Sequence, residues 1–149
     1  MTININEVAA EFTDLLNEWH SRPEVFDNAL DQQIHRWYAE AKPVWPKRPY
    51  FSPSAANSDK RELYVKALGA KRDITNHQPH QGRWTRLGTA IGDMIQRDLL
   101  FIEKHMTGAR FRFERDEQGR PMFEDFAKRN AEVLHRGHKF YLYGTPDGI

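Results

Sequence analysis

Proline occupies four of the eleven positions from 43 to 53, in the stretch KPVWPKRPYFSPS. Each proline lacks a backbone N–H group and disfavours helical backbone in the residue before it, so this stretch cannot form an α-helix. We expect an extended connector here, which is the one internal boundary that the sequence suggests. The chain therefore divides into residues 1–49 and residues 50–149.

Before the connector, apolar residues recur at helical spacing in two segments. In the first, Asn4 or Asn6 is a candidate N-cap, and the apolar residues are Val8, Phe12, Leu15, Leu16 and Trp19. In the second, Pro23 occupies a position typical of a first helical turn. The period then continues through Val25, Phe26, Leu30, Ile34, Trp37, Tyr38 and Ala41. We expect residues 1–49 to form a helical hairpin, which is acidic because residues 1–50 hold 5 Lys/Arg and 8 Asp/Glu.

After the connector the pattern predicts two more helices. Ser54 is a candidate cap for a short helix that Gly69 ends. The segment KRDITNHQPHQG is typical of a loop. From Arg83 to Met106 a set of apolar residues follows one helical face for about six turns, and Gly108 is the candidate C-cap.

The period of the apolar residues then changes. In RFRFER, Phe111 and Phe113 alternate with arginines, and the DEQG that follows is a turn signal, so we expect a half-buried strand and a hairpin. The segment AEVLHRGHKFYLYG predicts two strands about a turn at Gly137. Helices precede strands, which predicts an α/β (α+β) fold with helices packed on a small mixed sheet.

Composition limits the cellular setting. The chain of 149 residues has no cysteine, which excludes disulfides and Cys-ligated zinc. Its N-terminus lacks the pattern of a secretory signal, and no apolar run approaches membrane-spanning length. We therefore expect a cytoplasmic protein with no membrane partner. Residues 51–149 hold 17 Lys/Arg and 13 Asp/Glu, so this part is the better candidate for binding a polyanion, although an ordinary solvated surface has the same balance.

Two further patterns have simple structural explanations. The H-x-x-H pairs, His77 with His80 and His135 with His138, are candidates for a cysteine-free zinc site, but each flanks a turn residue, and we favour loop histidines. The final GTPDGI contains a favoured turn sequence. A turn after a buried strand also presents a carboxylate, here Asp147, at a sheet edge.

Three stretches, taken in order, resemble one known family. The run YFSPSAANSDKRELYVKALGAKRD resembles the start of RecB-like nuclease domains of the PD-(D/E)XK, or restriction-endonuclease-like, superfamily. The run RWTRLGTAIGDMI resembles the helix that follows in those proteins, and FYLYGTPDGI resembles the strand and turn that deliver a metal-binding aspartate. The resemblance covers residues 50–149 and has most in common with phage and prophage recombination exonucleases. It implies a restriction-endonuclease-like core that is incomplete in this chain.

The resemblance implies a metal-dependent DNA nuclease in which Asp147 is a ligand of Mg²⁺ or Mn²⁺. Such an ion neutralises developing charge and lowers the pKa of the attacking water, and it prefers carboxylate oxygens. In the family a second acid and a lysine follow on the next strand as an E-x-K element, which is missing here. We therefore expect a truncated nuclease domain that is catalytically inactive by itself.

The second stretch supplies the other expected site residues. Where relatives commonly carry histidine or glutamate, this sequence has Gly92, and Asp93 beside it is the substitute metal ligand and catalytic residue. A solvent-facing helix carboxylate is the alternative. The candidate phosphate-binding residues are Arg83 and Arg86 in this stretch and Lys60, Arg61 and Lys66 on the short helix, although ordinary surface charge explains the last three equally well.

The expected partners and cofactors follow from the same resemblance. DNA is the expected substrate. A second copy of the chain or a phage recombination protein is the expected protein partner, because Phe140 and Leu142 would lie on an unpaired strand edge. Some relatives hold an iron–sulfur cluster through a cysteine near Ser58 and Asp59, and the lack of cysteine excludes that cluster. The alternative function is a non-catalytic nucleic-acid-binding or protein-interaction module on a degraded nuclease fold.

Overall fold

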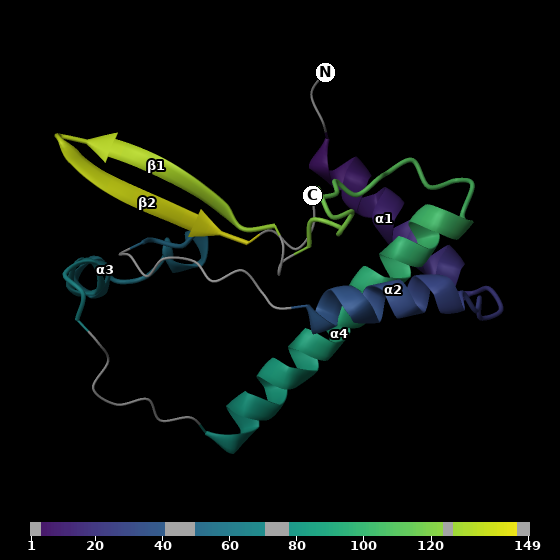
Figure 1. The fold of residues 1–149 in the computed structure, drawn as a ribbon. Coiled ribbons are helices and arrows are strands. Elements are labelled where there is room, and N and C mark those ends of the chain that lie inside the picture. Colours follow the sequence, from purple (N-terminus) through teal and green to yellow (C-terminus); the bar gives the residue numbers. More distant parts are fainter. Residues whose placement is uncertain (1–3, 41–49, 71–77, 124–126, 146–149) are drawn as a thin grey trace. The chain divides into compact units, whose positions relative to one another are not determined.

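The computed structural model describes residues 4–40, 50–70, 78–123 and 127–145. These residues form four α-helices, one 3₁₀ turn and one two-stranded antiparallel sheet, so the described part of the chain is α+β (Figure 1). The chain divides into two compact units, each made of two separate stretches. Unit 1 combines residues 1–40 with 77–112, and unit 2 combines residues 41–76 with 113–149. The division at residue 50 and the restriction-endonuclease-like core stay predictions.

The first predicted helix is confirmed. α1 spans Ile5–His20, and the Asn4 side chain caps it by accepting a hydrogen bond from the Asn6 N–H group at 3.1 Å. This bond satisfies one of the N–H groups that have no partner inside the helix. Leu15 is buried, while Ile5 at the start of the helix is exposed.

The second helix exists, but its predicted start at Pro23 is wrong. α2 spans Asn28–Ala39, and the Asp27 carboxylate caps it by accepting a hydrogen bond from the Leu30 N–H group at 3.0 Å. A carboxylate at the N-cap satisfies an N–H group of the first turn. The ring of Pro23 has no acceptor for such a bond, so the helix starts after Asp27 and not at Pro23. Phe26 consequently stays outside the helix and is exposed. The predicted period is kept in the buried residues Leu30, Ile34 and Trp37.

The longest helix starts earlier than predicted. α4 spans Pro79–His105, so part of the segment expected to be a loop is helical. Pro79 suits the first helical position, because an N–H group at that position would have no partner inside the helix. At the other end Met106, not Gly108, is the C-cap, and its N–H group donates to the Ile102 carbonyl oxygen at 2.9 Å. Among the described residues, no helix is both long enough and apolar enough to span a membrane.

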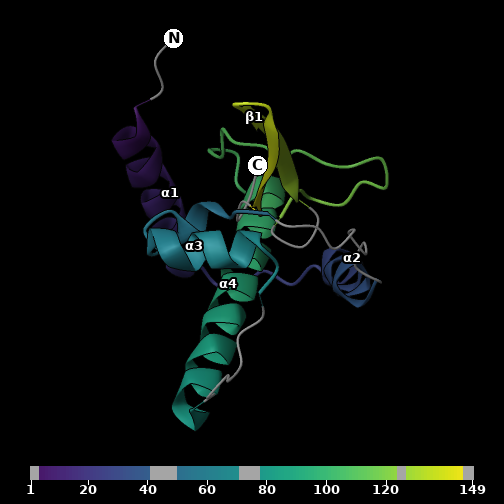
Figure 2. The ribbon, with the colours of Figure 1, turned by 90° about the vertical axis from the view of Figure 1, so that its left-hand side faces the viewer.

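The core of unit 1 lies between α1 and the C-terminal half of α4, which are side by side (Figures 1 and 2). Its buried residues are Leu15, Ile102, Met106 and Ala109, with Leu16, Trp19, Leu99 and Phe111 packed against them. The chain that leaves α4 turns back onto α1, where the rings of Phe12 and Phe111 are 4.9 Å apart.

The strand predicted in RFRFER is absent from the described residues. Phe111 packs on α1 in unit 1, whereas the ring of Phe113 lies 4.8 Å from that of Phe123 in unit 2, so their alternation reflects two separate packing contacts. The predicted turn at DEQG is confirmed. The Gly119 N–H group donates to the Asp116 carbonyl oxygen at 2.9 Å, and Gly119 adopts a positive φ of 76°.

The C-terminal hairpin is confirmed with its turn. β1 spans Arg129–His135 and β2 spans His138–Gly144, and the antiparallel register runs from Arg129 opposite Gly144 to His135 opposite His138. Partners in this register share a face of the sheet. Residue pairs Val133–Phe140 and Ala131–Leu142 therefore make one face apolar, as the alternation in the sequence predicts.

α3 spans Lys60–Ala67, and its predicted cap is wrong. Ser54 belongs to a separate 3₁₀ turn, Pro53–Ala55, while the Asp59 carboxylate caps α3 by accepting a hydrogen bond from the Arg61 N–H group at 2.8 Å. The predicted end of this helix is confirmed, because Gly69 follows it with a φ of 80° that residues with a side chain rarely adopt.

Candidate functional site

Two of the three stretches that carry the family resemblance meet within unit 2. The Phe51 N–H group donates to the Tyr141 carbonyl oxygen at 2.9 Å, and the Tyr143 N–H group donates to the Phe51 carbonyl oxygen at 2.9 Å. This parallel bridge joins the YFSPS stretch to the edge of β2 that faces away from β1. The expectation of an unpaired edge is therefore corrected at Tyr141 and Tyr143.

Aromatic side chains add contacts on both faces of this bridge. The ring of Tyr50 lies 5.2 Å from that of Tyr143, and the ring of Phe51 lies 6.1 Å from that of Phe140. Successive residues of a strand point to opposite faces, so the two ring pairs lie on opposite sides of the sheet. Contacts on one edge and both faces therefore fix the last residues of β2.

The expected metal ligand at the end of this strand lies outside the described residues. β2 ends at Gly144, and Pro53 packs beside it, since a Cβ atom on Gly144 would meet Pro53 Cγ at 3.6 Å. Asp147 follows in the sequence, and neither it nor its neighbours Pro146 and Gly148 are described. The structure thus describes the strand that leads to Asp147 and not the carboxylate.

The second expected ligand is exposed on α4. Asp93 belongs to unit 1, residue 147 belongs to unit 2, and Asp147 lies outside the described residues, so a site that joins the two carboxylates stays a prediction. Among the described residues, no three side chains of the His, Asp and Glu types gather where they could hold a metal ion. The magnesium site therefore stays a prediction.

The expected phosphate-binding residues are all exposed. Arg83 and Arg86 lie in the first half of α4, one before and one after the exposed Trp84 in the sequence. The others, Lys60, Arg61 and Lys66, lie on α3 in unit 2. Lys66 has an additional contact, because its Nζ atom lies 5.5 Å from the centre of the Tyr50 ring. Exposure leaves these cations accessible to a polyanion.

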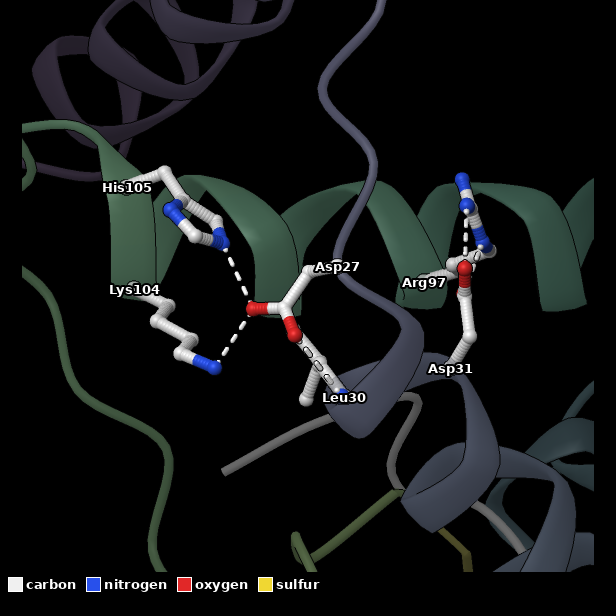
Figure 3. Close-up of polar contacts among 6 residues, drawn as sticks. All are labelled: Asp27, Leu30, Asp31, Arg97, Lys104 and His105. Atoms are coloured by element: carbon white, nitrogen blue, oxygen red, sulfur yellow. Dashed lines mark hydrogen bonds and ion pairs between the residues drawn. The ribbon is translucent and has the colours of Figure 1, made fainter.

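Sequence reasoning missed a set of ion pairs that join α2 to α4 within unit 1 (Figure 3). The Asp27 carboxylate accepts hydrogen bonds from Lys104 at 2.5 Å and His105 at 2.9 Å, in addition to capping α2. The hydrogen bond from Lys104, together with those from the Leu30 N–H group and His105, holds the pKa of Asp27 well below its ordinary value. Three donors occupy this carboxylate, so we assign it to the packing of the helices and not to a metal site.

A second ion-pair network lies further along α4. Arg97 donates to both carboxylate oxygens of Asp31, at 2.9 and 3.3 Å, and its guanidinium lies 4.4 Å from the centre of the Phe101 ring. The neighbouring Asp98 is buried, and its carboxylate is 3.0 Å from His20 Nε2 at the C-terminal end of α1. The network therefore ties α1 and α2 to the same turn of α4.

The two H-x-x-H pairs behave differently. His77 lies outside the described residues, and His80 is exposed in the first turn of α4. His135 and His138 are the last register pair before the hairpin turn, so their side chains lie on the same face of the sheet. Both are exposed, but they are the end residues of β1 and β2, so the prediction of loop histidines is wrong for this pair.

Comparison of the chain with protein families, with curated proteins and with solved structures finds no match.

Proposed function

We propose that this chain is part of a cytoplasmic, metal-dependent DNA nuclease that hydrolyses phosphodiester bonds, of the phage recombination and repair type within the PD-(D/E)XK superfamily. One observation carries the proposal beyond the sequence motifs. The YFSPS stretch pairs with β2 through two hydrogen bonds of 2.9 Å, directly before the GTPDGI turn. Two stretches that the resemblance relates to a single nuclease core are therefore in contact.

The contacts that hold β2 in place matter for the proposed chemistry. Phosphodiester hydrolysis requires a metal ligand to be held within a fraction of an ångström of its productive position, and a strand fixed on its edge and faces provides that support. Asp147 would be the ligand at the end of this strand, with Asp93 as the substitute for the acid that relatives carry. When bound there, Mg²⁺ or Mn²⁺ would supply charge neutralisation and a more acidic attacking water.

The small number of proposed metal ligands limits the activity that we expect of residues 1–149. Hard divalent cations take six or more oxygen ligands, and one or two carboxylates hold Mg²⁺ weakly. In the family an E-x-K element supplies another acid and the lysine that orients the water, and neither of these residues is among the site residues that we propose. We therefore expect residues 1–149 to bind DNA and to leave it intact.

The test is a Mg²⁺-dependent cleavage assay on linear duplex DNA. It compares residues 1–149, the product of the complete reading frame, and an Asp147→Asn variant of that product. We expect cleavage by the complete product alone and its loss in the variant. A complete product that leaves DNA intact under Mg²⁺ and Mn²⁺, or a variant that cleaves normally, would contradict the proposal.

One observation favours the alternative of a protein-interaction module. An exposed apolar stripe follows one face of the first half of α4, which extends beyond α1 and α2 in both views (Figures 1 and 2). Its residues are Trp84, Leu87 and Ile91, with Met94 just beyond the midpoint of the helix, and they are 45–75% exposed. A contiguous exposed apolar surface is typical of a protein contact. Under this alternative the complete product is inert toward DNA, and polar substitutions in the stripe abolish self-association or partner binding.

A further inference from the structure

We propose that the tip of the β1–β2 hairpin, residues 134–139, is a separate contact surface for DNA in which the Arg136 side chain binds a backbone phosphate. All residues of this tip are exposed. The inference rests on the proposed function only in taking DNA as the polyanion. It concerns the opposite end of β2 from the GTPDGI turn, and it requires no catalytic chemistry.

Charge is unevenly distributed along the hairpin. From Val133 to Thr145 the sequence contains no Asp or Glu, while the tip carries Arg136, Lys139 and two histidines. Lys139 forms an ion pair with Glu132 at 2.8 Å. In the part of the chain that the structure describes, no carboxylate pairs with Arg136. The positive charge at the turn is therefore free to meet an anion.

The backbone of Arg136 provides a second, independent observation. Its φ is 49°, and Gly137 follows with a φ of 79°, the arrangement of a type I′ turn. Arg136 is the one described residue other than glycine with a positive φ. Asparagine, aspartate or glycine normally occupies this position, because the Cβ atom of other residues crowds the backbone there without a compensating local hydrogen bond. An arginine held in an unfavourable conformation at an exposed turn points to a role for its side chain.

The shape of the hairpin suits duplex DNA. A two-stranded antiparallel ribbon is one of the elements that the major groove admits, and backbone phosphates flank that groove. At about 3.4 Å per residue, the tip lies roughly 24 Å from Gly144. The tip would therefore contact the duplex well away from the residues that surround Asp147.

Another polyanion must be distinguished from DNA. Leu134 is 71% exposed beside the cations, and a basic tip with an exposed apolar side chain also suits an anionic lipid surface. The groove-sized ribbon and the acid-free strand that extends behind the tip favour DNA. Vesicles that contain phosphatidylserine therefore form a separate arm of the test.

The experiment measures binding of residues 1–149 to a labelled DNA duplex by fluorescence anisotropy, with Ca²⁺ in place of Mg²⁺, across a range of salt concentrations. Arg136→Asn removes the charge and places a residue that tolerates positive φ in the turn, so the hairpin is kept. Arg129→Asn is the matched control. It removes the same charge at the other end of β1, where Arg129 is exposed and lies 3.4 Å from Glu114.

We expect Arg136→Asn to weaken binding about three- to tenfold and to lower the slope of log K against log salt by about one, as the loss of one phosphate contact predicts. Arg136→Lys should keep the slope, and Arg129→Asn should change binding less than twofold. Unchanged binding and slope in Arg136→Asn would overturn the inference and leave the nuclease proposal intact. Binding to the vesicles without binding to DNA would overturn both. If Asp147→Asn in the complete product abolishes cleavage but keeps the salt dependence of DNA binding, the catalytic site and the contact at the hairpin tip are separate.

Discussion

At the scale of single residues, the Asp27 carboxylate accepts hydrogen bonds from three donors. It caps α2 through the Leu30 N–H group and accepts hydrogen bonds from Lys104 and His105 on α4. The carboxylate therefore contributes both to the start of one helix and to its packing on another. Each contribution depends on the negative charge, because ionised acceptors form the stronger hydrogen bonds.

Asp27 should make the stability of the protein depend on pH. The hydrogen bond from Lys104, above all, lowers the pKa of Asp27 in the folded state from its ordinary value of 3.8. A depressed folded-state pKa means that this stabilisation is fully present above the unfolded value and is lost as the pH falls below it. We expect Asp27→Asn to be less stable than the wild type at neutral pH, by a difference that narrows progressively as the pH falls below 3.8. Urea unfolding at several pH values measures this difference, with the exposed Asp14→Asn as the control. A difference that grows toward low pH would contradict the assignment.

The sequence predicts local residue roles better than distant ones. Asn4 caps α1 because asparagine is a favoured N-cap residue, and Gly69 ends α3 because glycine tolerates the positive φ that follows a helix. Asp27 is a favoured cap type as well, but Val25 and Phe26 before it continue the apolar period, so the pattern predicts a start at Pro23 instead. The bond from Lys104 to Asp27 joins residues 77 positions apart, and no periodicity indicates a pair at that separation.

At the scale of elements, the two halves of α4 differ in burial. Leu87 and Ile91 are 61% and 45% exposed in the first half, whereas Ile102 in the second half has no exposed surface. We expect Leu87→Gln with Ile91→Gln to change the free energy of unfolding by about 0.5 kcal/mol or less, since exposed side chains contribute little. Ile102→Ala should lower it by about 2–5 kcal/mol through the cavity that it leaves. Chemical denaturation compares the variants. A large loss in the double glutamine variant would mean that the stripe is covered in solution.

The hairpin turn offers a test of backbone conformation with a matched control. Gly137 adopts a φ of 79°, whereas Gly108 lies outside the left-handed region and has no atom within 4 Å of an added Cβ. We expect Gly137→Ala to destabilise the hairpin by about 1 kcal/mol or more, and Gly108→Ala to be neutral or slightly stabilising. Hydrogen exchange of the β1 and β2 amides measures the first effect. Equal protection in both variants would argue against the type I′ turn.

The elements themselves were largely predictable from the sequence, and their boundaries were less so. The helices and the hairpin follow from periodicity and from Gly137, which are local signals. The strand expected around Phe111 and Phe113 was wrong, because the two rings pack in different units and no local pattern records this. The bridge from Phe51 to β2 joins stretches about ninety residues apart, and only the family resemblance suggested that they belong together.

At the scale of the whole molecule, each compact unit is built from stretches that are distant in the sequence. Residues 1–40 pack with 77–112, and residues 41–76 pack with 113–149, so the chain passes between the units three times. The proline-rich connector marks one of these passages, close to the boundary at residue 40. The passage near residue 112 lies within the charged segment RFRFER. This segment contains no proline or glycine, so the sequence gives no comparable signal there.

The candidate site was less predictable than the fold. Its expected ligands, Asp93 and Asp147, come from motif positions, and a motif does not state which residues complete a metal site. Carboxylates become ligands only where several converge. The described residues provide no such convergence, so the support for the site lies in the pairing of β2 with Phe51.

The division into units predicts what the first forty residues do. Leu15, Leu16 and Trp19 of α1 cover Ile102 and its neighbours on α4, so deleting residues 1–40 exposes an apolar face that is now largely buried. Loss of such contacts costs several kcal/mol, which is comparable to the whole stability of a small domain. We expect the shortened chain to lose amide protection in α4 and to self-associate.

The same deletion leaves the contacts inside unit 2 unchanged, because its two stretches lie outside the removed residues. Protection of the amides in β1 and β2 should therefore persist, which separates loss of unit 1 from general unfolding. Hydrogen exchange and size-exclusion chromatography, applied to residues 41–149 and to residues 1–149, measure both effects. A shortened chain that stays monomeric with full protection in α4 would show that α1 and α2 are not part of the core. That outcome would also remove part of the reason for the acid dependence expected of Asp27, since its carboxylate joins α2 to α4 in addition to capping α2.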